Sequence, residues 1–222
     1  VTAFQFLPIA FIASLYPALS HYWQENRAQL VVTFERAMKY SLIIATPLAI
    51  GVAAIAETVV SIFAAGFEAA ILPLQVSALT IFFMFINYPV GSLLNACDEQ
   101  KANTRHMIIT ALASVVLNII LIPLYGVMGA IVTAVLSTAL LFTLNWLRAL
   151  RVIKTSMKMI YVTFMKTLLA SVLMGVSIYW LSQWLNIFVV VAIAMLVYFA
   201  CLLVLGGIKK TDIFSVLKSF KK

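Results

Sequence analysis

The sequence predicts an all-α protein that crosses a membrane about seven times, and three observations lead to that fold class. Of the 222 residues, 64% are hydrophobic and only 10% are charged, and the mean hydropathy is +1.11. A soluble domain carries roughly 25% charged residues to cover its surface, so this composition is typical of a chain in a bilayer. The apolar residues also form runs long enough to span, and the basic residues gather between alternate runs.

Seven apolar runs have the length of a transmembrane helix. A bilayer core about 30 Å thick needs roughly 20 helical residues at about 1.5 Å each. The predicted spans lie at about 1–20, 40–62, 73–96, 107–125, 127–146, 159–181 and 186–208.

A stretch of mixed polarity separates the first two runs. In residues 21–39 apolar and charged side chains alternate, which predicts a helix lying along the membrane surface with its apolar side down. Pro8 and Pro17 fall within the first run and Pro47 within the second, and each can kink its helix by removing a backbone hydrogen bond. Glu57, near the end of the second run, lies at the membrane surface or couples transport to H⁺ or Na⁺.

A tight hairpin joins the fourth and fifth runs. Pro123 fixes its own φ and suits the last turn of a helix, and Gly126 can take the left-handed conformation that ends one. The chain is therefore predicted to reverse over residues 124–127. Gly129 then opens the next helix with a small residue, which lets helix backbones approach closely. On these residues alone, the hairpin is equally consistent with a short turn between any two membrane helices.

Few polar groups fall inside the runs. Lys166 lies about 10 Å along the sixth helix, so its side chain either reaches back to the headgroups or faces a substrate. Residues 209–222 mix lysines with apolar residues at helical spacing, which predicts an amphipathic tail on the anionic inner leaflet, or a partner-binding segment. The uncharged polar residues within the runs are predicted to form hydrogen bonds between helices: Gln5, Asn87, Asn95, Asn118 and Asn145.

Alternate linkers differ in charge. The second, fourth and sixth linkers carry no Lys or Arg, whereas the others carry Arg27, Arg36, Lys39, Lys101, Arg105, Arg148, Arg151, Lys154 and Lys158. Basic loops are retained in the cytoplasm, so the odd linkers and the C-terminus are predicted to be cytoplasmic and the protein to lie in the inner (cytoplasmic) membrane. The net charge of +8 is thereby assigned to topology and not to nucleic acid.

The sequence contains no pattern typical of a catalytic or metal site. A nucleophile with a base, a paired carboxylate, a glycine-rich phosphate loop and metal-ligand spacing are all missing. Cys97 and Cys201 are far apart, and His21 and His106 stand alone at the edges of the runs. We therefore expect no enzyme activity, no metal and no bound cofactor.

Four segments, in order, resemble the polysaccharide flippases of the multidrug/oligosaccharidyl-lipid/polysaccharide (MATE/MOP) exporter superfamily, including O-antigen translocases. The segments are 6–20 with its Pro-x-Leu-Ser exit, 46–66, 94–101 and the hairpin 118–130. The resemblance implies five spans of the C-terminal lobe of a fourteen-helix, two-lobe transporter in residues 1–148. Two additional transmembrane helices would follow in 149–208, and the basic tail in 209–222.

The resemblance also implies a function. Such proteins flip an undecaprenyl-pyrophosphate-linked oligosaccharide, a repeat unit of O-antigen, capsule or exopolysaccharide, by alternating access. By similarity the first helix would line the central cavity, so Phe4, Gln5 and Pro8 are candidates there, together with Lys166. The basic residues expected to hold the pyrophosphate are otherwise absent from this sequence, which departs from the family. The implied partners are membrane lipid, the lipid-linked substrate, a missing N-terminal lobe and the glycan polymerase machinery.

Other functions stay open at this point. A MATE-type drug/cation antiporter of the same superfamily is the nearest alternative. A membrane-embedded glycan polymerase or ligase would need a large external loop with catalytic residues, and the external linkers hold only the charge of Glu68. A structural membrane subunit without a cavity is the third alternative.

Overall fold

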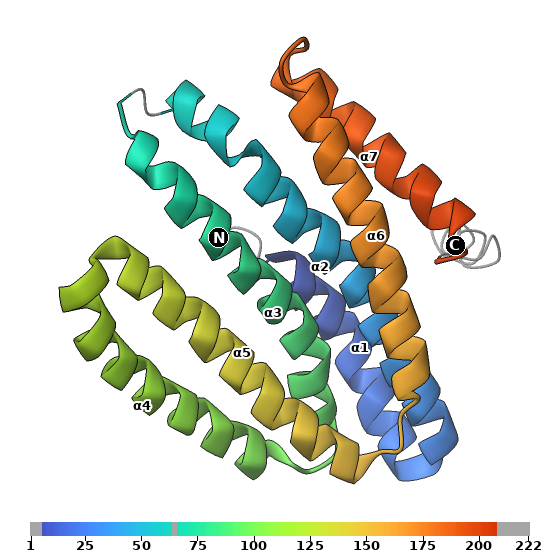
Figure 1. The fold of residues 1–222 in the computed structure, drawn as a ribbon. Coiled ribbons are helices and arrows are strands. Elements are labelled where there is room, and N and C mark those ends of the chain that lie inside the picture. Colours follow the sequence, from blue (N-terminus) through green and yellow to red (C-terminus); the bar gives the residue numbers. More distant parts are fainter. Residues whose placement is uncertain (1–5, 64–65, 208–222) are drawn as a thin grey trace.

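The described part of the protein consists of long helices that run back and forth. The structure is a computed structural model that describes residues 6–63 and 66–207. Those residues form seven α-helices and one short 3₁₀ helix, and no strand (Figure 1). The elements are α1 (Phe6–Glu25), α2 (Arg27–Phe63), η2 (Glu68–Ala70), α3 (Ile71–Ala96), α4 (Gln100–Tyr125), α5 (Val127–Val152), α6 (Met157–Leu181) and α7 (Ile187–Val204).

The predicted fold class is confirmed. Among the described residues, six helices are long and apolar enough to cross a membrane, namely α2 to α7. The helix α1 has 20 residues but is not among those six, and the first predicted span begins outside the described residues. The chain is therefore an all-helical, multi-pass membrane protein.

The predicted surface helix over residues 21–39 is wrong. Its first residues end α1, and the rest form the opening turns of α2, which continues without a break for 37 residues. Leu30, Phe34 and Met38 lie on one face of α2 at helical spacing, and each side chain is at most 2% exposed. Their apolar face packs into the core cluster with α1, α3 and α5 instead of lying on lipid.

The helices α2 and α3 form the centre of the bundle, and two helical pairs attach to them. Among the described elements, α2 and α3 share the most extensive contact. The α4–α5 pair packs on α3 through α5, and the α6–α7 pair packs on α2 through α6 (Figure 1). One buried cluster joins α1, α2, α3 and α5, and a second joins α2, α6 and α7.

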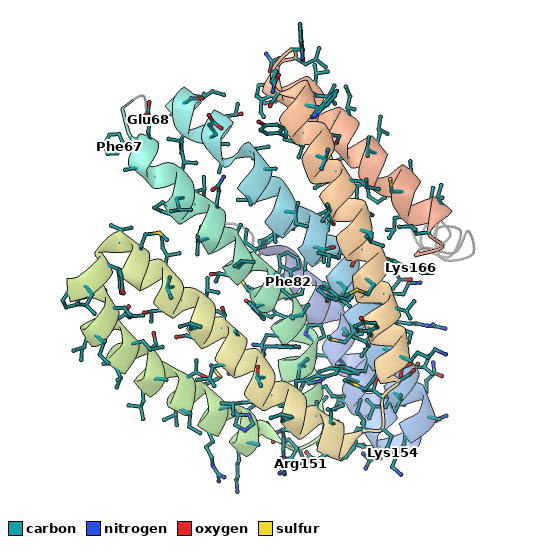
Figure 2. The ribbon with its side chains drawn as sticks, viewed as in Figure 1. Phe67, Glu68, Phe82, Arg151, Lys154 and Lys166 are labelled. Atoms are coloured by element: carbon teal, nitrogen blue, oxygen red, sulfur yellow. The ribbon has the colours of Figure 1, made fainter. Side chains whose placement is uncertain are left out.

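The charged connections lie at one end of the bundle. The chain turns there between α1 and α2, between α3 and α4, and between α5 and α6, and we call this the basic end. Arg151 and Lys154 lie at the basic end, and Phe67 and Glu68 lie at the opposite end (Figure 2). The separation of charge predicted from the linkers is therefore present in the fold.

The turn between α4 and α5 consists of one residue. The helix α4 ends at Tyr125 and α5 begins at Val127, so the predicted reversal over 124–127 is confirmed. Gly126 lies between them with φ +56°, a conformation that side chains disfavour. A Cβ atom on Gly129 would overlap the backbone carbonyl of Leu121, so only glycine permits the two helices to approach this closely.

Candidate functional site

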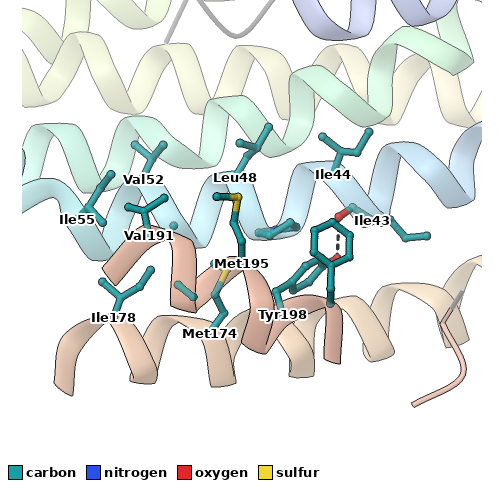
Figure 3. A pocket seen from close by; sticks show the side chains of 14 residues that line it. Ile43, Ile44, Leu48, Val52, Ile55, Met174, Ile178, Val191, Met195 and Tyr198 are labelled. Atoms are coloured by element: carbon teal, nitrogen blue, oxygen red, sulfur yellow. Dashed lines mark hydrogen bonds between the residues drawn. The ribbon is translucent and has the colours of Figure 1, made fainter. Parts of the chain in front are cut away.

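An apolar groove lies between α2, α6 and α7. Its volume is about 400 Å³. The groove is formed by α2 on one side and by α6 and α7 on the other (Figure 3). Its walls are branched aliphatic side chains, two methionines and two aromatic rings, and they include Leu48, Val52, Met174, Ile178, Met195 and Tyr198.

A proline in α2 explains how α7 is attached at the groove. Pro47 has no backbone N–H, so the carbonyl of Ile43, one turn earlier, loses its usual partner within the helix. The hydroxyl of Tyr198 on α7 donates a hydrogen bond to that carbonyl oxygen at 2.6 Å (Figure 3). A buried carbonyl is costly to leave unpaired, so this bond holds α7 against α2. The sequence pattern indicated Pro47 as a break in the helix but gave no indication of Tyr198.

Two glycines bring α6 close to α2 along the groove. A Cβ atom on Gly51 would lie 3.5 Å from Cε of Met174, and one on Gly175 would lie 3.0 Å from Cγ2 of Ile50. Small residues at these positions let the helices approach, as is usual in membranes. Because α7 contacts α6 and only parts of α2, the space between α2 and α7 stays open as the groove.

The groove is suited to bind an apolar chain. Among the described side chains that line it, none is charged, and the hydroxyl of Tyr198 is already used. Methionine side chains adapt their shape to irregular apolar partners. The groove can therefore hold a branched hydrocarbon, and it offers no group for acid–base or nucleophilic chemistry.

Lys166 lies outside the groove. Its Nζ donates a hydrogen bond to the carbonyl oxygen of Gly206 at 3.3 Å, just beyond the end of α7. Unpaired carbonyls and the helix dipole make a helix C-terminus favourable for a cation. Lys166 is therefore engaged at the end of α7. Glu57 is exposed on α2 and does not line the groove either.

Pro8 lines a second, smaller cavity. This cavity has a volume of about 90 Å³ and lies between α1, α2 and α3, with Tyr88 in its wall. Tyr88 also lines a third cavity of about 160 Å³ between α3 and α5, together with Asn87. Phe4 and Gln5, the other predicted cavity residues, lie outside the described residues.

The remaining predicted positions lie within helices. Pro17 is inside α1, and Pro123 is inside α4 near its last turn. Asn118 is half-buried on α4. The prediction that asparagines bond between helices is confirmed for Asn145, whose Nδ2 atom donates to Oδ1 of Asn87 at 3.2 Å.

Comparison with known proteins identifies a similar fold. The chain is 31% identical over 125 residues to the uncharacterized membrane protein MJ1068 of Methanocaldococcus jannaschii, a stretch that covers 55% of this chain and 25% of that protein. No protein-family model matches the chain. The solved structure of the lipid II flippase MurJ, in an inward closed conformation, matches with a TM-score of 0.71 at 18% identity.

The lengths of these matches differ. The alignment with MurJ covers 96% of this chain and 46% of MurJ, so the chain spans less than half of that protein and a quarter of MJ1068. The chain therefore has the fold of part of MurJ.

Proposed function

We propose that this chain is part of a transporter that flips a lipid-linked oligosaccharide across the membrane. The fold likeness to MurJ, which is named a lipid II flippase, supports a substrate that carries a lipid. The sequence segments that resemble polysaccharide flippases support a glycan as the polar part. The chain would supply the C-terminal lobe, and a second lobe would complete the central cavity and rock against it.

The apolar groove is the observation that carries this proposal. A lipid-linked oligosaccharide has a long branched tail that must stay in apolar surroundings while its polar head crosses. The groove between α2, α6 and α7 has apolar walls and a volume of about 400 Å³ (Figure 3). It can hold a segment of such a tail next to the transport path.

The proposal extends to the polar head of the substrate, to the site of its pyrophosphate and to the orientation of the chain in the membrane. We infer that the head is an undecaprenyl-pyrophosphate-linked repeat unit of O-antigen, capsule or exopolysaccharide. The described walls of the groove supply no cation for the pyrophosphate, so that role falls to the second lobe. The basic end, with Arg151 and Lys154, would face the cytoplasm, as basic loops do in the inner membrane.

A pair of substitutions on α7 tests the groove. Val191 lines the groove, whereas Val189 lies two residues away with its side chain 47% exposed on the outer side of the helix. We expect Val191→Trp to occupy the space of the tail and to lower glycan export by the full-length protein roughly tenfold, which corresponds to a loss of about 1.4 kcal/mol in tail binding. Val189→Trp is the matched control and should export normally. The measurement is rescue of surface glycan in a strain that lacks the gene.

The outcomes separate the competing functions. If both variants are made at normal levels and rescue equally, the groove does not bind the substrate tail. If the strain lacking the gene exports glycan normally but becomes sensitive to cationic drugs, the protein is an antiporter of the same superfamily and the flippase proposal is wrong.

A further inference from the structure

The interface between α4 and α5 is unusually polar for a helical pair in a membrane. On α4, polar residues recur at intervals of four, and on α5 they recur at intervals of four or eight, so each set lies on one helix face. We call these two facing rows the polar seam: His106, Thr110, Ser114 and Asn118 on α4, and Thr133, Ser137 and Asn145 on α5.

Two contacts fix how the rows face each other. Gly129 lies against Leu121 near the turn, and Nδ1 of His106 lies 2.8 Å from Oδ1 of Asn145 at the other end. Along the seam, three hydroxyl groups are buried without a hydrogen-bond partner among the described residues. They belong to Thr110, Thr133 and Ser137.

The seam ends in a network of amides at the basic end. Asn145 is 1% exposed, and its Nδ2 atom donates to Oδ1 of Asn87 on α3 and to Oδ1 of Asn103 on α4, at 3.2 and 3.1 Å. Nδ2 of Asn103 donates in turn to Oδ1 of Asn95 on α3 at 3.0 Å. Asn145 therefore ties three helices together, while α4 itself has little other contact with α3.

The network determines which nitrogen of His106 carries hydrogen. Both hydrogens of the Asn145 amide are used for Asn87 and Asn103, so its oxygen must act as the acceptor. Nδ1 of His106 therefore donates, and in the neutral ring Nε2 is left without hydrogen. His106 is only partly buried, so a proton from water can reach Nε2 without breaking the network.

We propose that His106 is a proton-binding site that tightens the attachment of the α4–α5 pair to α3. Binding of a proton at Nε2 turns the ring into an imidazolium, while Nδ1–H still donates to Asn145. A charged donor forms a stronger hydrogen bond than a neutral one. Asn145 is then polarised and donates more strongly to Asn87 and Asn103.

The neighbouring charges do not reverse the effect of the proton on the hydrogen bond between His106 and Asn145. The titratable and charged groups at this end of the three helices are Glu99, Lys101 and Arg105 at α4, Arg148 and Arg151 at α5, and Tyr88, Cys97 and Asp98 at α3. Arg148 donates twice to Glu99, at 3.0 and 2.6 Å, so these two charges largely offset each other. Lys101, Arg105 and Arg151 are exposed, and solvent and salt weaken their repulsion.

Histidine NMR tests the site directly. The chain contains two histidines, and His21 on α1 serves as an internal reference, because it lies at the surface beside Glu25. In ¹⁵N-histidine spectra of the chain in bicelles, we expect His106 to be an Nδ1–H tautomer at pH 8 and to gain a proton at Nε2 on acidification. An Nε2–H tautomer, or a ring that stays neutral down to pH 5, would overturn the proposal.

Hydrogen exchange tests the consequence. After correction for the intrinsic pH dependence, amides of α5 around Asn145 should exchange roughly two- to tenfold more slowly at pH 6 than at pH 8. His21→Gln should keep this difference and His106→Gln should abolish it. The same difference in His106→Gln, or none in the unmodified chain, contradicts the proposal. No substrate is present in either experiment, so the result is independent of the transport function.

Discussion

The two helical pairs that flank α2 and α3 are attached by different means. The α4–α5 pair packs on α3 through α5 and is also joined to it by a network of side-chain amides, with Asn145 at the centre. The α6–α7 pair is joined to α2 mainly by apolar packing around Gly51 and Gly175, with one hydrogen bond from Tyr198. Fewer residues are buried in the most apolar parts of α4 and α5 (6% and 11%) than in those of α6 and α7 (28% and 22%).

The surrounding lipid explains why the two pairs need more than ordinary apolar contact to stay attached. Lipid tails are as apolar as leucine side chains, so apolar contact alone gives little reason for helices to associate in a membrane. The α4–α5 pair adds side-chain amides that form hydrogen bonds with each other and with α3. The α6–α7 pair is held by the close approach of the α2 and α6 backbones at Gly51 and Gly175, and a groove remains beside α7. Polar attachment favours a fixed position, and apolar attachment leaves space for a ligand.

The largest effect is expected at Gly129. A Cβ atom there would overlap the backbone of Leu121 and Ile122, which cannot move without opening the hairpin. We expect Gly129→Ala to lower the free energy of unfolding by about 3 kcal/mol. Gly51→Ala is the control in the other pair, because its Cβ would lie 3.5 Å from Met174 and can be accommodated. Thermal unfolding in detergent measures the stability of both variants. Equal melting temperatures for Gly129→Ala and Gly51→Ala would contradict the expected difference between the two helical pairs.

A smaller effect is expected at Asn145. Asn145→Leu removes three hydrogen bonds and leaves polar groups of His106, Asn87 and Asn103 without their partner, so we expect a loss of about 2 kcal/mol. Asn118→Leu is the control, since Asn118 lies on the same seam but makes no side-chain hydrogen bond with the described residues. If both variants unfold alike in detergent, the amides do not hold the pair.

Local chemistry made parts of this fold predictable. The turn at Gly126 follows from the conformational limits of proline and glycine, which act within a few residues. The spans follow from composition, and the basic end follows from the linkers that carry charge. None of these features depends on which helix packs against which.

Which helix packs against which was harder to predict from the sequence. The spacing of Leu30, Phe34 and Met38 indicates an apolar face, but a membrane surface and a helical core both suit such a face, and the fold places it in the core. Likewise, Pro47 reveals that a carbonyl is free, but nothing local points to Tyr198 as its partner. The predicted bonding role is confirmed for Asn87, Asn95 and Asn145 and is wrong for Asn118 among the described residues, and the partners were not predictable.

The bond between Tyr198 and Ile43 offers a more sensitive test of the apolar pair. Tyr198→Phe leaves the carbonyl of Ile43 unpaired, so we expect a loss of about 1 kcal/mol. Pro47→Ala restores the backbone N–H that can satisfy this carbonyl within α2. In a double-mutant cycle, Tyr198→Phe should therefore cost clearly less in the Pro47→Ala background. Additive effects on unfolding would show that the proline and the tyrosine are not linked through this carbonyl.

The smallest effect concerns the connection between α3 and α4, beside the polar attachment. Cys97 is buried there, and burial raises the pKa of its thiol to about 12, although nearby Arg27 acts in the opposite direction. Only the thiolate reacts with maleimide. In a Cys201→Ala background, we therefore expect labelling of Cys97 at pH 8 to be at least about tenfold slower than labelling at an exposed reference position. The reference is Ser156→Cys in a variant that also carries Cys97→Ser. Between pH 8 and 10 the Cys97 rate should keep rising with pH. The exposed site should level off at a lower pH, because a thiol at the N-terminus of α6 ionises more easily than a buried one. Fast labelling of Cys97 at pH 8 would mean that this end of the α4–α5 pair opens readily, contrary to a fixed attachment.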